Sequence, residues 1–192
     1  MQIIDGTGRG YQAKVDDGNR LLTATVTEAT IANASADGRS FSAGTPFLTI
    51  TTTEGHMIYY ANNCGVDAVV SKLYVNWNGG SSNYDRPCYM TWYREPSAPS
   101  ANNTTSALLN LNLGSGNTAS DCVVEYWDEV STGMTISSAG TPGGFCIFGP
   151  GQTTMDINDS IIIPNGSAMS LAFKGEEAGE LSVIMSMSYR AS

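Results

Sequence analysis

Catalysis that depends on a histidine has a single place to occur in this sequence. His56 is the only histidine among 192 residues, and it precedes an alternating run at residues 57–61. No serine lies in a G-x-S-x-G elbow, and a cysteine nucleophile would need His56 beside one of four cysteines with apolar neighbours. We therefore expect His56 to be an edge or loop histidine with no catalytic role.

Carboxylate pairs are the second candidate for catalysis, because two of them about 5.5 Å or 6.5 to 9.5 Å apart can hydrolyse glycosides. The candidate pairs are Glu125 with Glu129, on either side of Trp127, and a group formed by Glu176, Glu177 and Glu180. In a chain with a formal charge of −9, solvating charges at strand ends and loop tips are the simpler interpretation. The sequence therefore predicts that the protein is not an enzyme.

Metal and cofactor motifs are incomplete. The four cysteines are widely spaced along the chain, without the close ligand pairs of a zinc site. Residues 156–160 and 16–19 resemble parts of calcium loops but lack their ligand spacing, so Asx turns are the simpler interpretation. Residues 6–10 lack the preceding strand and following helix of a phosphate-binding loop. We expect no metal and no cofactor.

The cysteines are expected to be free thiols. Each of Cys88, Cys122 and Cys146 has large apolar neighbours, which is typical of buried free cysteine. No feature of the sequence indicates an oxidising compartment, in which disulfides persist. Disulfide bonding is the alternative for the four cysteines, which are Cys64, Cys88, Cys122 and Cys146.

Aromatic residues are the feature that a binding function can use. In a regular strand at residues 88–93, Tyr89 and Tyr93 lie opposite Trp92, so some aromatic side chains must lie outside the core. Exposed aromatic area marks either a sugar platform, for which the three tryptophans are candidates, or a subunit interface. We favour the subunit interface, and a glycan is the alternative partner. The tryptophans are Trp77, Trp92 and Trp127.

The composition limits the other partners. A formal charge of −9 and a pI near 4.3 repel a phosphate backbone, so direct nucleic-acid binding is not expected. No stretch approaches 18 apolar residues, so no membrane span is expected, and no secretory signal begins the sequence. Only 14% of residues are charged, against about 25% in typical domains, which predicts a surface of Ser, Thr, Asn and Gly.

The elements that position these residues are predicted to be strands. From residue 45 onward, short alternating runs are separated by Gly, Pro, Asn and Ser clusters, which is typical of an all-β fold. The clearest run, at residues 181–189, places Leu181, Val183, Met185, Met187 and Tyr189 on one face. Residues 171–174 and this run are expected to form a hairpin, and Leu109, Leu111 and Leu113 to face inward from another strand. Eight to ten such strands predict an antiparallel, jelly-roll-like β sandwich.

The first 40 residues are predicted to be an extended N-terminal arm, and residues 41–192 the β-sandwich domain. The arm contains no Phe or Trp, and its bulky apolar residues are too scattered to close a core. A short strand is expected at residues 22–26 and a short helix at residues 28–36. We expect the arm to attach to a neighbouring subunit or shell through Tyr11, Val15, Leu21, Leu22 and Val26.

The opening segment carries a family resemblance. Residues 4–16 have the sequence I-D-G-T-G-R-G-Y-Q-A-K-V-D, followed by N-R-L at residues 19–21 and V-T-E at residues 26–28. This pattern resembles the start of small virion structural proteins of tailed bacteriophages, in which it precedes a β-rich body. The match is good across this opening segment and only general after it.

The resemblance implies a non-enzymatic virion component, assembled in the cytoplasm of the bacterial host. Our leading expectation is a capsid decoration or cement protein that forms a homotrimer and binds the major capsid protein or another virion protein. The alternative is a carbohydrate- or receptor-binding module of a tail or fibre.

Overall fold

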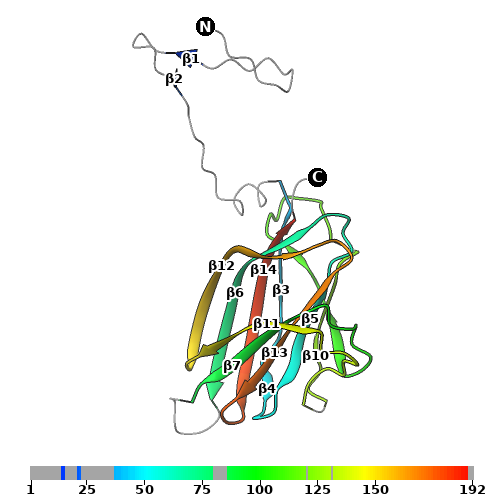
Figure 1. Cartoon of the computed structure of the whole chain (residues 1–192), viewed down its shortest axis with the longest axis vertical. Helices are drawn as coiled ribbons and strands as arrows, with labels where there is room; N and C mark the ends of the chain where they lie inside the picture. Colours follow the sequence, from blue (N-terminus) through cyan, green and yellow to red (C-terminus); the bar gives the residue numbers. More distant parts are fainter. Residues whose placement is uncertain are drawn as a thin grey trace.

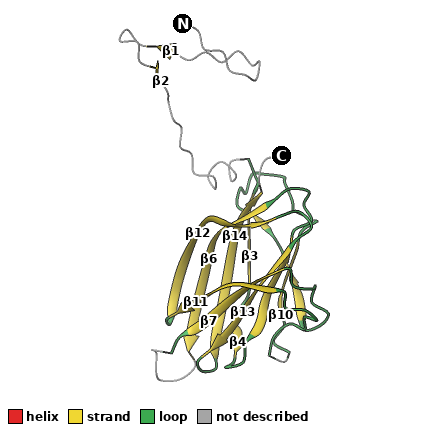
Figure 2. Ribbon diagram, viewed as in Figure 1, coloured by secondary structure: helices red, strands yellow, loops and turns green. Residues whose placement is uncertain are grey.

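The computed structural model describes residues 14–15, 21–22, 37–79, 86–119, 121–130 and 132–189, and this part of the chain contains strands and no helix (Figures 1 and 2). Two short strands precede the body, β1 (Lys14–Val15) and β2 (Leu21–Leu22), and they pair with each other. The body is built from β3 (Ser40–Gly44), β4 (Leu48–Ile50), β5 (Gly55–Ala61), β6 (Ala68–Gly79), β7 (Cys88–Arg94), β8 (Asn103–Ser106), β9 (Leu109–Asn110), β10 (Val123–Trp127), β11 (Thr141–Phe148), β12 (Gly151–Ile163), β13 (Ala168–Gly175) and β14 (Gly179–Tyr189).

Two antiparallel six-stranded sheets contain these strands. One sheet has the order β11-β7-β13-β5-β10-β8, and the other has the order β12-β6-β14-β3-β9 with β4 also pairing with β14. Figure 1 shows the two sheets as face-to-face layers, with β12, β6, β14 and β3 in one and β11, β7, β13 and β5 in the other. The predicted all-β sandwich is confirmed.

The strand order is that of a jelly roll. The eight strands of the jelly roll are β3, β5, β6, β7, β11, β12, β13 and β14. In one sheet β3 lies beside β14, β14 beside β6, and β6 beside β12. In the other sheet β5 lies beside β13, β13 beside β7, and β7 beside β11. Strands β8, β9 and β10 are additions along one side of the sandwich, all from the segment between β7 and β11. In both sheets, strands from the first half of this set alternate with strands from the second half, which is the double Greek key of jelly rolls.

The core lies between the sheets and consists of the inward side of each strand. On β14, the five residues assigned to the inner face are all buried, while Ile184 on the other face is 46% exposed. They meet Met90, Leu171 and Phe173 from the opposite sheet within one buried cluster. Alternation along the last strand therefore sets its register, because a slip by one residue would move this whole set into water.

Two predictions about individual strands are wrong. Strands β13 and β14 do not form a hairpin: β13 pairs with β5 and β7, and β14 pairs with β3, β4 and β6 in the other sheet. Leu109, Leu111 and Leu113 do not face the core, since Leu113 is 98% exposed and the others are also exposed. Instead the side-chain amide of Asn110 turns toward the protein and donates to the carbonyls of Gly38 and Asn117.

The expected strand at residues 22–26 and helix at residues 28–36 lie outside the described residues, apart from Leu22, which ends β2. Strand β3 begins at Ser40. The body is therefore described from residue 37 onward, and the expected arm remains a prediction.

Candidate binding surface

An open groove lies on the outer face of the sheet that contains β7, β13 and β11. Along β7, Cys88 and Met90 are buried in the core, so the alternate residues Tyr89, Thr91 and Tyr93 point outward. The groove has a volume of about 590 Å³, and its remaining lining comes from Glu54, Lys174, Phe145 and the Pro142–Gly143–Gly144 backbone. Phe145 on β11 is 70% exposed. This surface therefore combines three aromatic rings with one carboxylate and one ammonium group.

The polar groups of this groove are held by their neighbours. The Tyr93 hydroxyl donates to Glu54 Oε1 at 2.8 Å, and the Lys174 ammonium lies 5.4 Å from the centre of the Tyr89 ring. Partial burial, the hydrogen bond to Glu54 and the Glu54 charge raise the pKa of Tyr93 to about 12. Tyr93 is therefore a neutral donor at physiological pH, and Glu54 retains capacity to accept further hydrogen bonds.

His56 lies next to this groove but is directed toward a buried serine. Its Nδ1 lies 2.9 Å from the Ser170 hydroxyl, and its ring lies 4.9 Å from the Tyr93 ring. Burial lowers the pKa of His56, against the opposing effect of the Glu54 charge. Ser170 is only 1% exposed, so a substrate carbonyl would not reach its hydroxyl. The pair resembles a nucleophile and base in composition, but its position fits a structural contact within the sheet.

The first carboxylate pair is engaged in structural hydrogen bonds. Glu125 accepts from the Asn103 side-chain amide at 2.8 Å, and Glu129 accepts from the backbone N–H of Thr49 at 2.6 Å. In the second group, Glu176 lies 3.7 Å from Arg86 in an exposed ion pair. These contacts account for Glu125, Glu129 and Glu176 without a reaction, and the prediction that the protein is not an enzyme stays a prediction.

Two of the three tryptophans are unsuitable as sugar platforms. Trp77 and Trp127 are 1% and 2% exposed, and their indole N–H groups donate to the carbonyls of Arg86 and Val130. Trp92 is half-buried and packs beneath Gly143, where a Cβ would overlap its ring. The aromatic side chains that line the outer groove are the exposed Phe145 and the half-buried Tyr89 and Tyr93, of which the two tyrosines follow from strand alternation.

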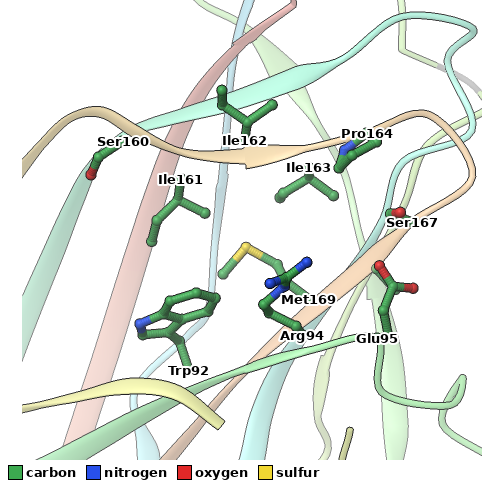
Figure 3. A pocket seen from close by; sticks show the side chains of 11 residues that line it. Trp92, Arg94, Glu95, Ser160, Ile161, Ile162, Ile163, Pro164, Ser167 and Met169 are labelled. Atoms are coloured by element: carbon green, nitrogen blue, oxygen red, sulfur yellow. The ribbon is translucent and has the colours of Figure 1, made fainter. Parts of the chain in front are cut away.

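A second hollow lies between the two sheets, where β12 faces β7 and β13 (Figure 3). Its volume is about 330 Å³. Figure 3 shows Ile161 and Ile163 on one side and Trp92 and Met169 on the other, with Arg94 and Glu95 at the same opening. We call this hollow the inter-sheet cleft. No pattern in the sequence predicts it, because its walls come from strands of different sheets that are distant along the chain.

The expectation of four free thiols is wrong for two of them. Cys64 and Cys122 form a disulfide that joins the β5–β6 connection to the residue before β10, with their Cα atoms 5.6 Å apart. Cys88 and Cys146 are free, and Cys88 is buried while Cys146 is half-buried. The long separation of the bonded cysteines along the chain concealed their proximity, which depends on the pairing of β5 with β10.

The residues predicted for attachment are only partly described. Val15 lies in β1 and pairs with Leu21 of β2, whose other residue is Leu22. Tyr11 and Val26 lie outside the described residues. The structure therefore brings Val15 and Leu21 together and leaves the attachment surface a prediction.

The described part of the chain lacks two further features. It contains no group of three His, Cys, Asp or Glu side chains placed to hold a metal ion. It also contains no helix with the length and apolar character needed to cross a membrane.

Comparison with known proteins gives little similarity. No protein-family model matches the sequence, and no curated protein matches it. A solved structure of Maize Chlorotic Mottle Virus, determined by single-particle analysis, contains a chain that is 11% identical over 80% of this chain and 93% of that chain. The TM-score is 0.22, which is too low to support an argument about fold or function. The fold assignment rests on the strand order alone.

Proposed function

We propose that this chain is a non-enzymatic structural component of a bacteriophage particle, with capsid decoration or cementing as its role. The observation that carries the proposal is the jelly-roll strand order, in which β3 lies beside β14 and β5 beside β13. Jelly rolls form viral capsid and lectin domains, among other binding proteins. The phage-like opening sequence favours the first of these uses.

Exposed apolar side chains on the body support self-association. Phe145 and Ile147 project from the edge strand β11, and Leu109 and Leu113 lie exposed on the opposite side of the sandwich. Burying such side chains stabilises an interface by about 25 cal/mol per Å² before the cost of association is subtracted. Our proposal for the assembly is a homotrimer that binds the major capsid protein or another virion protein.

The charge distribution supports an outward position on the particle. Residues 41–192 contain five basic and thirteen acidic residues, which disfavours contact with packaged nucleic acid. The arm at residues 1–40 would make the attachment by strand addition, in which backbone hydrogen bonds supply affinity. Many copies on one shell would make a weak individual contact effective.

The test is incorporation into particles that lack this protein. Deleting residues 1–26 should leave a body that folds, measured by its thermal unfolding, but that no longer sediments with particles. In the full chain, serine substitutions at the five predicted attachment residues should produce the same loss, while Phe47→Ser, an exposed change on the body, should not. Normal incorporation of the truncated chain would refute attachment through the arm, and a solution mass equal to one chain would refute the trimer.

The outer groove favours a second candidate function, carbohydrate or receptor binding. Sugar rings stack on exposed aromatic side chains, and the Glu54 carboxylate and Lys174 ammonium can bond sugar hydroxyl groups. Phe145→Ala and Tyr89→Ala should each abolish retention on a glycan array, whereas Phe47→Ala, at another exposed phenylalanine, should retain it. If the native protein is not retained by any glycan, this candidate is excluded.

A further inference from the structure

The inter-sheet cleft has the form of a site for a small molecule. Its volume of about 330 Å³ lies within the range of ligand pockets, about 300 to 1,000 Å³, and holds roughly ten water molecules. Ile163 and Met169 are almost fully buried, and Trp92 and Ile161 are half-buried, so these walls are apolar. Water against these four side chains has few hydrogen-bond partners and is readily displaced by an apolar group, whereas Arg94, Glu95, Ser160 and Ser167 give the rest of the lining polar groups.

Irregularities in both sheets border the cleft. Between Asp156 and Ile161, β12 advances five residues while its partner β6 advances two, and Ile161 then faces the cleft. On the opposite sheet, β11 has an extra residue at Gly143, directly against Trp92. β-Bulges re-aim side chains beside functional sites. Figure 3 shows Ile161 directed toward the ring of Trp92. The backbone of Gly143 lies against the same ring.

The opening of the cleft carries the groups that would select a ligand. Arg94 follows Trp92 by two residues on β7, so both side chains lie on the same side of the strand. Figure 3 shows its guanidinium in the space between Met169 and Ile163, both of which line the cleft. A guanidinium binds carboxylates in a bidentate manner, and an adjacent low-dielectric wall strengthens the contact. Glu95 lies at the same opening and would oppose an anion.

We propose that the inter-sheet cleft binds a small carboxylate with an apolar body, with the body between Trp92 and Ile161 and the carboxylate on Arg94. A short fatty acid and an aromatic acid share this chemistry. The proposal does not depend on the attachment of the protein to a particle, because the cleft lies within one chain.

The experiment is calorimetric titration of the full-length protein with octanoate and with phenylpropionate, each compared with its neutral amide. We expect one acid to bind at one site per chain with a dissociation constant of about 0.1 to 1 mM, and its amide about tenfold more weakly. Binding of octanoate alone identifies a chain-like ligand, and binding of phenylpropionate alone identifies a flat one. An acid that binds no better than its amide overturns the proposal, as does the absence of saturable binding by both acids.

Three charge variants assign the site to Arg94. Arg94→Gln should weaken the acid by about tenfold or more and leave the amide unchanged, because only the acid uses the charge. Arg86→Gln removes the same charge two residues before the start of β7, at the end away from Arg94, and should have no effect. Glu95→Gln should strengthen acid binding, a change that a purely structural role would not produce. Equal acid affinity in native protein and Arg94→Gln would overturn the assignment.

Discussion

Asn62 connects two loops at one end of the sandwich, and replacing it with alanine should cause a large loss of stability. The residue is fully buried, and its side-chain amide donates to the carbonyl of Val66 at 2.9 Å and to that of Ile163 at 2.8 Å. Its Oδ1 accepts from the backbone N–H of Cys64 at 3.3 Å. Asn62→Ala therefore leaves the carbonyls of Val66 and Ile163 and the N–H of Cys64 without these partners, of which the bond to Ile163 is buried and the other two are partly buried.

The expected size follows from these three groups. An unsatisfied buried polar group costs about 1 to 3 kcal/mol, and a water entering the vacated space recovers part of that. We therefore expect Asn62→Ala to lower the free energy of unfolding by about 2 to 4 kcal/mol. For a domain of this size, each kcal/mol shifts Tm by about 2 to 4 °C, so Tm should fall by about 4 to 16 °C.

The assay is thermal and urea unfolding of native protein and variants, with equal m-values as the condition for comparing midpoints. Asn165→Ala is the matched control, because Asn165 lies in the adjacent turn, is exposed, and accepts a single hydrogen bond from Gly65. Asn62→Asp keeps the volume but removes the donors, and it should be at least as destabilising as alanine. If Asn62→Ala were no more destabilising than Asn165→Ala, the reasoning from buried hydrogen bonds would be refuted.

Three further predictions concern other parts of the body. Replacing Cys64 and Cys122 together by serine should lower the free energy of unfolding by about 2 to 5 kcal/mol in non-reducing buffer. A reductant should abolish most of the difference in Tm between this variant and the native protein, and equal Tm values without reductant would contradict the disulfide. Gly55→Ala should lower Tm because a Cβ there would overlap the backbone of the facing loop, while Gly116→Ala, with no atom within 4 Å, should not; similar Tm values for both would contradict the close approach. Burial lowers the pKa of His56 below 6.5, so on acidification the unfolded chain binds a proton at this residue before the folded protein does, and stability should fall as pH drops below about 6.5. His56→Gln should flatten this part of the Tm–pH profile, and an unchanged profile would show that His56 does not contribute.

The sequence predicted the fold class because alternation is a local property. On β14, every second residue from Leu181 to Tyr189 is buried, so this strand could be recognised without its neighbours. The outward position of Tyr89 and Tyr93 followed from the same alternation on β7. Features that depend on a period of two within one strand could therefore be predicted from the sequence.

Features that depend on which strands pair with each other could not be predicted from the sequence. Strands β13 and β14 are separated by a short connection, which favours a hairpin locally, yet each finds partners in a different sheet. The outer groove combines Glu54, Phe145 and Lys174, and no spacing rule relates these three positions. Leu109 was misplaced because its segment is anchored by Asn110, whose hydrogen bonds to the backbone outweigh the alternating pattern.

The position of β14 at the centre of its sheet has a consequence for synthesis. Its neighbour β3 is the first strand of the body to be made and β14 is the last, yet Met187 pairs with Phe41. Until β14 has been synthesised and has left the ribosome, β3 and β6 have no strand between them, so this sheet cannot close on the nascent polypeptide. Such long-range pairing slows folding and exposes unpaired edges to other chains. Chaperone dependence during translation should therefore end abruptly when the last strand emerges.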